Sequence, residues 1–116
     1  MNPVTAITGA LADRVLDDVL VRTFCSAAMT EAAAIGERIG CAINQTPDER
    51  NAITRKLGAF KTSMLQDVEA GKPLEIDALL TVVREIARRV DVPAPNLEAL
   101  LGLTRVFARS RGLYRG

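Results

Sequence analysis

The chain has 116 residues, of which 48% are hydrophobic and 25% are charged, a balance typical of a folded domain and not of a disordered segment. Fifteen basic and fourteen acidic residues give a net charge of +1, so we expect neither nucleic acid nor an anionic membrane as a partner. No histidine is present, which excludes Ser-His and Cys-His catalysis and most catalytic zinc sites. No apolar run reaches the roughly 18 residues of a membrane helix, and no secretory signal is visible.

The two cysteines, Cys25 and Cys41, match no zinc or CxxC redox spacing. We expect both to be buried, reduced thiols of a cytoplasmic protein. A disulfide is the less favoured alternative, because a continuous helix would hold the two residues about 24 Å apart.

The composition predicts an all-α fold, since aromatic residues make up only 3% while Ala and Leu are frequent. The segment Asn2–Gly9 has no helix start before it and looks like the middle of a longer element. The first predicted helix spans Asp17–Ile39, with two aspartates at its start and Gly40 as a left-handed cap. Its apolar residues recur at helical spacing: Leu20, Phe24, Ala28, Ile35 and Ile39.

Helix start and stop signals predict the remaining elements in the same way. The run 46–49 is a capping box that opens a helix to about Ala59. Ser63 caps a short helix that ends at Gly71, and a connector leads to a helix over Glu75–Val90. An extended break at 92–95 precedes a last helix from Pro95 or Asn96, followed by a frayed, basic tail from Arg109 to Gly116. We therefore expect a single domain, residues 1–116, built as a bundle of five or six helices.

Ser63 and Glu75 are the most informative polar residues, because they stand at two successive helix starts. Neighbouring helix N-termini favour an anion, so a small carboxylate substrate suits this segment. The alternative is two capped helices with nothing bound. Glu31 lies near the apolar face of its helix and is expected to pair with an arginine or to cap an interdomain contact. No glycine-rich phosphate loop and no βαβ unit occur in the sequence.

Residues 63–79, which read SMLQDVEAGKPLEIDAL, resemble the C-terminal domain of ketopantoate reductase (2-dehydropantoate 2-reductase). Three further segments are similar to that family: residues 2–6 (NPVTA), Met29-Thr-Glu31 followed by Gly40, and residues 92–95 (VPAP). The resemblance implies an all-α domain of the 6-phosphogluconate dehydrogenase C-terminal type, which binds ketopantoate beside an N-terminal NADPH domain. It further implies NADPH-dependent reduction of ketopantoate to pantoate, in pantothenate biosynthesis.

Carried over to this sequence, the resemblance implies three substrate-binding residues. Asn2 would hydrogen-bond the substrate, Ser63 would bind its carboxylate, and Glu75 would contact its hydroxyl or carbonyl oxygen. A 2-oxo acid substrate is expected only together with a nucleotide domain, and a homodimer is expected as well.

The sequence also departs from the family pattern. It holds neither the nucleotide domain nor the family's catalytic lysine, so we expect no catalytic residue, no bound cofactor and no activity from this chain alone. Thr81 stands where the family usually has glycine and could crowd the helix packing. The alternative function is a non-enzymatic helical oligomerisation module. In either case we expect exposed apolar surface on Pro3–Leu11 and the long helix, and self-association.

Overall fold

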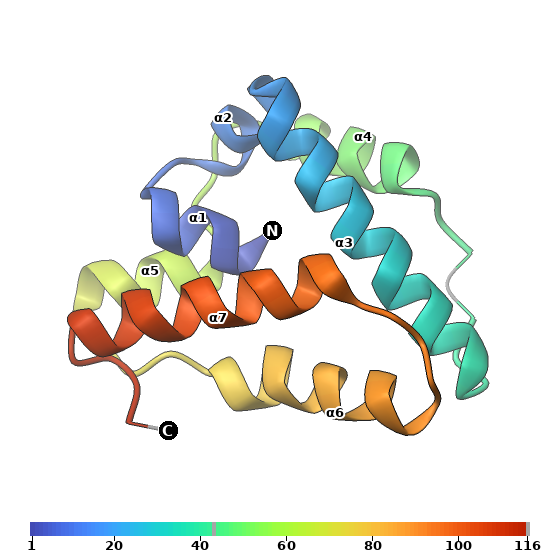
Figure 1. The fold of residues 1–116 in the computed structure, drawn as a ribbon. Helices are drawn as coiled ribbons and strands as arrows, with labels where there is room; N and C mark the ends of the chain where they lie inside the picture. Colours follow the sequence, from blue (N-terminus) through green and yellow to red (C-terminus); the bar gives the residue numbers. More distant parts are fainter. Residues whose placement is uncertain (43, 116) are drawn as a thin grey trace.

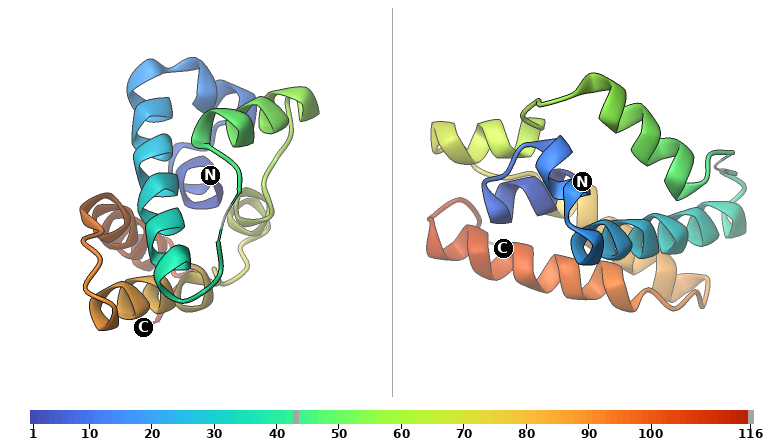
Figure 2. Two further views of the ribbon diagram at one scale, coloured as in Figure 1. Left: turned by 90° about the vertical axis from the view of Figure 1, so that its right-hand side faces the viewer. Right: turned by 90° about the horizontal axis from the view of Figure 1, so that it is seen from above.

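The computed structural model describes residues 1–42 and 44–115, which form seven α-helices, one π-helical segment and no strand (Figure 1). The predicted all-α fold is therefore confirmed. In chain order the elements are α1 (Asn2–Thr8), α2 (Ala12–Asp17), α3 (Val19–Arg38), α4 (Pro47–Leu57), α5 (Ser63–Ala70), η1 (Asp77–Thr81), α6 (Val82–Arg89) and α7 (Pro95–Ser110). The molecule is flat, with extents of 36 × 34 × 21 Å, as the two views in Figure 2 show.

The N-terminal region contains two short helices that the sequence did not predict. The segment expected to be the middle of an element forms α1, with Pro3 in its first turn, where a missing N–H costs nothing. The helix expected over Asp17–Ile39 is observed as α3, which begins at Val19 because the Asp18 carboxylate caps it by accepting hydrogen bonds from the amides of Leu20 and Val21. The residues before it form the separate helix α2.

Local capping signals explain the middle of the chain. Thr46 and Glu49 form the expected capping box, with reciprocal hydrogen bonds of 3.1 and 3.3 Å. Gly71 ends α5 in the left-handed region at φ 69°, which favours glycine. The cap of α5 was misassigned by one residue: Thr62 accepts the hydrogen bond from the Leu65 amide, and Ser63 is the first helical residue.

The predicted helix over Glu75–Val90 is observed as η1 followed by α6, so its first part is wound as a π-helix. Thr81 lies at the end of η1, half-buried, and its hydroxyl donates to the Asp77 carboxylate at 2.8 Å. The hydroxyl is thus engaged within its own helix, and crowding of the helix packing by Thr81 stays a prediction.

Two apolar clusters hold the helices together. The larger one joins α1, α3, α5, η1 and α7, and its members include Val4, Cys25, Met64, Ile76, Leu80 and Leu101. A smaller cluster of Ile35, Ala87 and Ala94 joins α3 to α6. Leu20, predicted from its spacing to face the core, is instead 78% exposed on the first turn of α3.

Helix α3 is, by length and composition alone, apolar enough to cross a membrane. The sequence-based expectation required an uninterrupted apolar run, whereas this helix is apolar on average although it contains the charged residues Arg22 and Glu31. The same helix packs against α2, α4, α6 and α7 and contributes buried residues to both clusters. A single helix that meets this criterion is weak evidence, so a membrane span does not follow.

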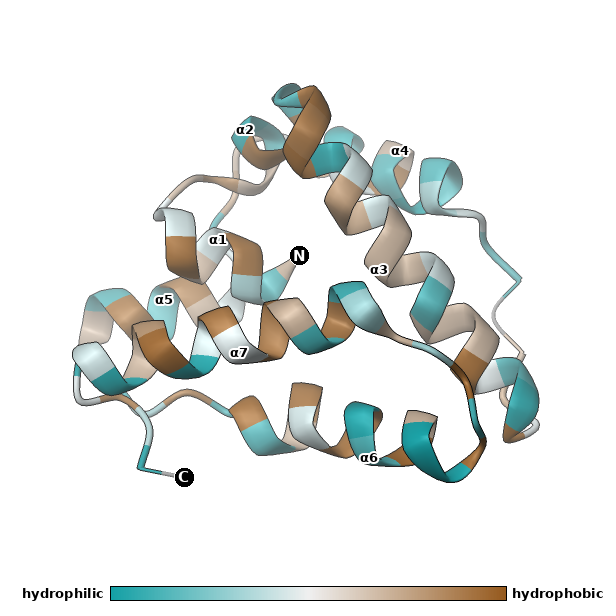
Figure 3. Ribbon diagram, viewed as in Figure 1, coloured by the Kyte–Doolittle hydropathy of each residue, from teal (hydrophilic) through white to brown (hydrophobic). Residues whose placement is uncertain are grey.

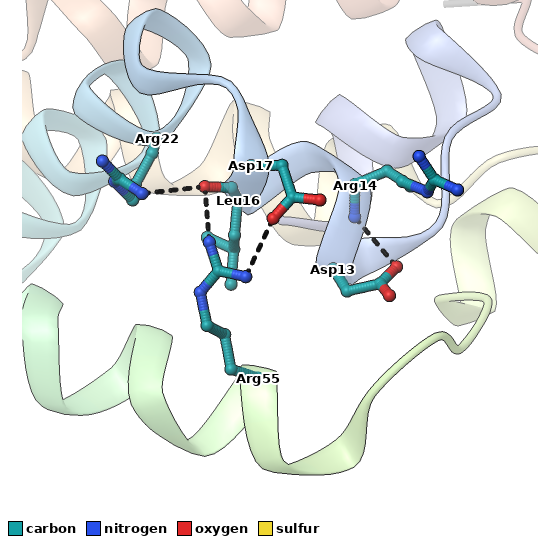
Figure 4. Close-up of polar contacts among 6 residues, drawn as sticks. All are labelled: Asp13, Arg14, Leu16, Asp17, Arg22 and Arg55. Atoms are coloured by element: carbon teal, nitrogen blue, oxygen red, sulfur yellow. Dashed lines mark hydrogen bonds and ion pairs between the residues drawn. The ribbon is translucent and has the colours of Figure 1, made fainter.

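An arginine on α4 fixes the junction between α2 and α3 (Figure 4). Arg55 donates to the backbone oxygen of Leu16 at 2.9 Å and pairs with Asp17 at 3.0 Å. Arg22 donates to the same oxygen at 3.1 Å. The carbonyls at the end of a helix have no intrahelical partner, so these guanidinium groups satisfy the end of α2.

As far as residue 115, the C-terminal tail is held against the fold where the sequence predicted fraying. Gly112 adopts φ 69° after the end of α7 and turns the chain back toward η1. The Leu113 amide donates to the Ala108 oxygen at 2.8 Å, and the Leu113 side chain is buried in the larger cluster. The tail is held because this one leucine finds an apolar site, which helical periodicity does not reveal.

Both cysteines are free thiols, but only one matches the expected burial. Cys25 is buried in the larger cluster, whereas Cys41 is exposed after the end of α3. The expectation of two buried thiols is wrong for Cys41, because α3 ends at Arg38 and leaves that residue outside the helix packing.

Candidate functional site

Two of the three residues expected to bind substrate lie next to each other. The start of α1 lies beside the start of α5, and the Ser63 hydroxyl donates to the Asn2 side-chain oxygen at 3.5 Å, a long hydrogen bond (Figure 1). Ser63 is exposed and Asn2 is half-buried. A hydroxyl and a carboxamide therefore meet at the surface, at the first turn of α5, where amide groups point outward.

A buried pair of threonines holds α1 beside the start of α5. The hydroxyls of Thr5 and Thr62 hydrogen-bond to each other. Thr5 lies within α1, which begins with Asn2, and Thr62 is the N-cap of α5, which begins with Ser63. Thr5 also donates to the Asn2 backbone oxygen at 2.9 Å. The pair was not predicted, because its partners are 57 residues apart and each alone resembles an ordinary helix residue.

Glu75 is presented differently from the other two residues. It lies between buried Leu74 and buried Ile76, which fix its backbone, while its own side chain is exposed. Within residues 1–42 and 44–115, neither a hydrogen bond nor an ion pair engages its carboxylate, and none joins it to Asn2 or Ser63. The carboxylate is thus free to accept a hydrogen bond from a ligand.

Asp77, two residues further on, is the engaged carboxylate of this segment. It accepts hydrogen bonds from the Tyr114 hydroxyl at 2.7 Å and from the Thr81 hydroxyl at 2.8 Å. These bonds, with that of Tyr114 the stronger influence, lower the pKa of Asp77 below its usual value of 3.8. In the Glu-Ile-Asp motif, Asp77 is therefore hydrogen-bonded within the fold, whereas the Glu75 carboxylate has no partner among the described residues.

Among the described residues Glu31 forms no ion pair with an arginine, which was one of its two expected roles; the other, a cap of an interdomain contact, stays a prediction. Its carboxylate accepts hydrogen bonds from the Asn96 amide at 3.1 Å, the Asn96 side chain at 2.7 Å and the Leu97 amide at 2.9 Å. The partner is therefore the start of α7, and Glu31 has a structural role.

Within residues 1–42 and 44–115 the structure shows neither a glycine-rich nucleotide loop nor a cluster of metal ligands. The left-handed glycines among these residues lie at helix ends and not in a glycine-rich loop after a strand, as a dinucleotide pyrophosphate requires. In the same part of the chain, no three Cys, Asp or Glu side chains are grouped so that they could hold a metal. The chemistry of this surface is confined to hydrogen bonding by a hydroxyl, a carboxamide and a carboxylate.

Comparison with known proteins identifies the family. Residues 1–108 match the family model described as "Ketopantoate reductase PanE/ApbA C terminal". The chain belongs to this family. As a ketopantoate reductase C-terminal domain, it is 42% identical over 113 residues to the 2-dehydropantoate 2-reductase of Mesorhizobium japonicum (strain LMG 29417 / CECT 9101 / MAFF 303099). That match covers 97% of this chain and 35% of the relative, so the chain spans about a third of that enzyme.

Solved structures agree with the ketopantoate reductase fold. A crystal structure from Ralstonia solanacearum MolK2, of a protein assigned as a ketopantoate reductase, is 60% identical with a TM-score of 0.92. The match covers 98% of this chain and 34% of the Ralstonia protein. The 2-dehydropantoate 2-reductase of Methylococcus capsulatus is 28% identical with a TM-score of 0.88, over 96% of this chain and 39% of that one. The expected resemblance of sequence and fold is therefore confirmed.

Proposed function

We propose that this chain is the substrate-binding part of a 2-dehydropantoate 2-reductase, which reduces ketopantoate to pantoate with NADPH in pantothenate biosynthesis. The observation that carries the proposal is the family match over residues 1–108, together with 42% identity to a 2-dehydropantoate 2-reductase. The enzyme would be cytoplasmic, as expected for soluble biosynthetic chemistry.

In this function Asn2, Ser63 and Glu75 bind the substrate. Ser63, at the N-terminal turn of α5, suits the substrate carboxylate, because hydroxyl and amide donors favour an anion there. Asn2, 3.5 Å away, adds a carboxamide that can donate or accept. The unpaired Glu75 carboxylate accepts a hydrogen bond from the substrate hydroxyl. All three are reachable from solvent, as a site that a second domain completes must be.

The reduction itself requires groups that these residues do not provide. A nucleotide domain would hold NADPH, which would supply a hydride to the carbonyl carbon, and the family's lysine would supply the proton to the carbonyl oxygen. The role of this chain is to orient the 2-oxo acid so that its carbonyl faces the nicotinamide. We therefore expect no reductase activity from the chain alone and no saturation in an NADPH fluorescence titration at micromolar concentrations.

A chimera tests the assignment of substrate and site. The matching third of the Mesorhizobium japonicum enzyme is replaced by this chain, and ketopantoate reduction is measured at saturating NADPH. We expect activity, which falls about 100-fold or more in kcat/KM for Glu75→Ala because a substrate contact is lost. Glu85→Ala is the matched control, since Glu85 is also exposed, in α6. A chimera that folds and binds NADPH but leaves ketopantoate unreduced would contradict the proposal.

A second candidate is a non-enzymatic helical module that associates with itself. The observation that favours it is an apolar groove of about 280 Å³ between α1, the start of α3 and α7, lined by residues that include Val4, Ile7, Leu20, Phe24 and Leu103. Figure 3 shows hydrophobic stretches on these three helices in one view. A homodimer that covers this groove is compatible with both functions, and a ketopantoate reductase from Staphylococcus aureus with the same fold is described as dimeric.

A further inference from the structure

We propose that the C-terminal turn, defined as Leu113 and Tyr114, positions Glu75 for the substrate by holding the residues on both sides of it. This inference rests on the proposed substrate site. It adds a positioning role for two residues that lie beyond the family-model match, which ends at residue 108.

The need for a positioning device follows from where Glu75 lies. It ends the non-helical connector between α5 and η1, and within the described residues its carboxylate has neither a hydrogen bond nor an ion pair to hold it. A carboxylate that binds substrate must be held within about 0.5 Å of its productive position, and irregular segments hold side chains less precisely than helices do. The neighbouring residues must therefore supply the order.

Leu113 holds the residue before Glu75. The Leu74 amide donates to the Leu113 backbone oxygen at 2.9 Å, and both leucine side chains are buried in the larger apolar cluster. Leu113 is in turn fixed to the end of α7 through the Ala108 oxygen. The connector is thus attached to α7, a long helix whose start is itself anchored on α3.

Tyr114 holds the residue two positions after Glu75. Its hydroxyl donates to the Asp77 carboxylate at 2.7 Å, and the Arg109 guanidinium lies 5.5 Å from the centre of its ring. The hydrogen bonds to Asp77 fix the first turn of η1, where Glu75 enters the helix. With one contact before Glu75 and one after it, the turn limits both the position and the direction of its side chain.

The first test uses the 116-residue chain and measures the tether itself. Tyr114→Phe removes one hydroxyl and keeps the ring. The change removes the hydrogen bond from Tyr114 to Asp77 and so loosens the turn that carries the Leu113 oxygen, the acceptor of the Leu74 amide. We expect hydrogen exchange at the Leu74 amide to rise about three- to tenfold. Ser110→Ala is the matched control, since it removes a hydroxyl that bonds only to the Phe107 oxygen on the same segment. Unchanged exchange at Leu74 overturns the proposal.

The second test uses the active chimera and asks whether the tether acts through Glu75. Tyr114→Phe is expected to raise the KM for ketopantoate or lower kcat about three- to tenfold, while the KM for NADPH stays unchanged. In a Glu75→Gln background the same change is expected to cost nothing further, because the group being positioned is gone. An equal loss in both backgrounds overturns the proposal and indicates a general structural effect.

The proposed function fails in a distinguishable way. If Glu75→Gln leaves ketopantoate reduction unchanged while Tyr114→Phe still raises exchange at Leu74, the substrate site is wrong and the positioning role is overturned with it. If Glu75→Gln lowers reduction strongly, with measurable activity left, while Tyr114→Phe changes neither exchange nor kinetics, the substrate site stands and only the positioning role is overturned.

Discussion

Glu31, in the middle of α3, caps α7 by binding both the backbone amide and the side chain of Asn96, 65 residues later in the chain. The Leu97 amide completes the contact at 2.9 Å. Amides at a helix start have no intrahelical acceptor, and a negative charge there is favoured by the helix dipole. Since α7 has no side-chain cap of its own, Glu31 takes the place of a local capping residue.

Replacing Glu31 should therefore destabilise the fold more than replacing an ordinary surface residue does. We expect Glu31→Ala to lower the free energy of unfolding by about 2–3 kcal/mol, because three donors lose a charged acceptor. Urea unfolding monitored by circular dichroism measures this. Glu37→Ala, on the exposed face of the same helix, is the control and is expected to change stability by less than about 0.5 kcal/mol. Equal effects of the two changes would show that the cap is energetically unimportant.

Asp77 should make stability depend on acid pH. Its pKa is lowered in the folded protein by the hydroxyls of Tyr114 and Thr81, so its contribution is present above the unfolded value of 3.8. That contribution is lost as the pH falls through the lower, folded pKa. We expect the stability difference between the native sequence and Asp77→Asn to shrink from about pH 7 to about pH 2, measured by urea unfolding. A difference that stays constant over this range would contradict the assignment.

The apolar groove should mediate self-association. Leu20 and Leu103 line the groove and are 78% and 62% exposed. Large apolar side chains exposed together are typical of an interaction surface. We expect sedimentation to show a concentration-dependent dimer, and Leu103→Glu to give a monomer because the charge cannot be buried. Leu57→Glu is the matched control, since Leu57 is 66% exposed on α4, outside the groove. A strict monomer at high concentration would contradict this interface.

The two thiols should react at very different rates. Burial raises the pKa of the Cys25 thiol, which lowers its thiolate fraction, whereas Cys41 is exposed. A thiol-specific chromogenic reagent is expected to modify one equivalent rapidly in the folded chain and the second only after unfolding. Cys41→Ser is expected to abolish the rapid phase. Rapid modification of both thiols in the folded chain would mean that the cluster around Cys25 opens readily.

The sequence by itself determined those features whose cause lies within a few residues. The capping box of Thr46 and Glu49 and the left-handed turn at Gly71 are short-range interactions, so their residues predict them directly. The family motif over residues 63–79 is also a local string, which is why membership and fold could be predicted before any geometry. Asn2, Ser63 and Glu75 were named as site residues on the same basis, and their binding role stays a prediction.

Only the tertiary structure decided which groups are already used by the fold. Periodicity placed Leu20 in the core and predicted a frayed tail, yet Leu20 is exposed and Leu113 is buried. The charges gave no sign that Glu31 caps α7 or that Tyr114 binds Asp77. Each of these contacts joins residues at least 37 positions apart, and such pairings depend on how whole helices pack. Packing occupies Glu31 and Asp77 and leaves Glu75 without a partner, because a carboxylate is satisfied only by the donors that the fold brings to it.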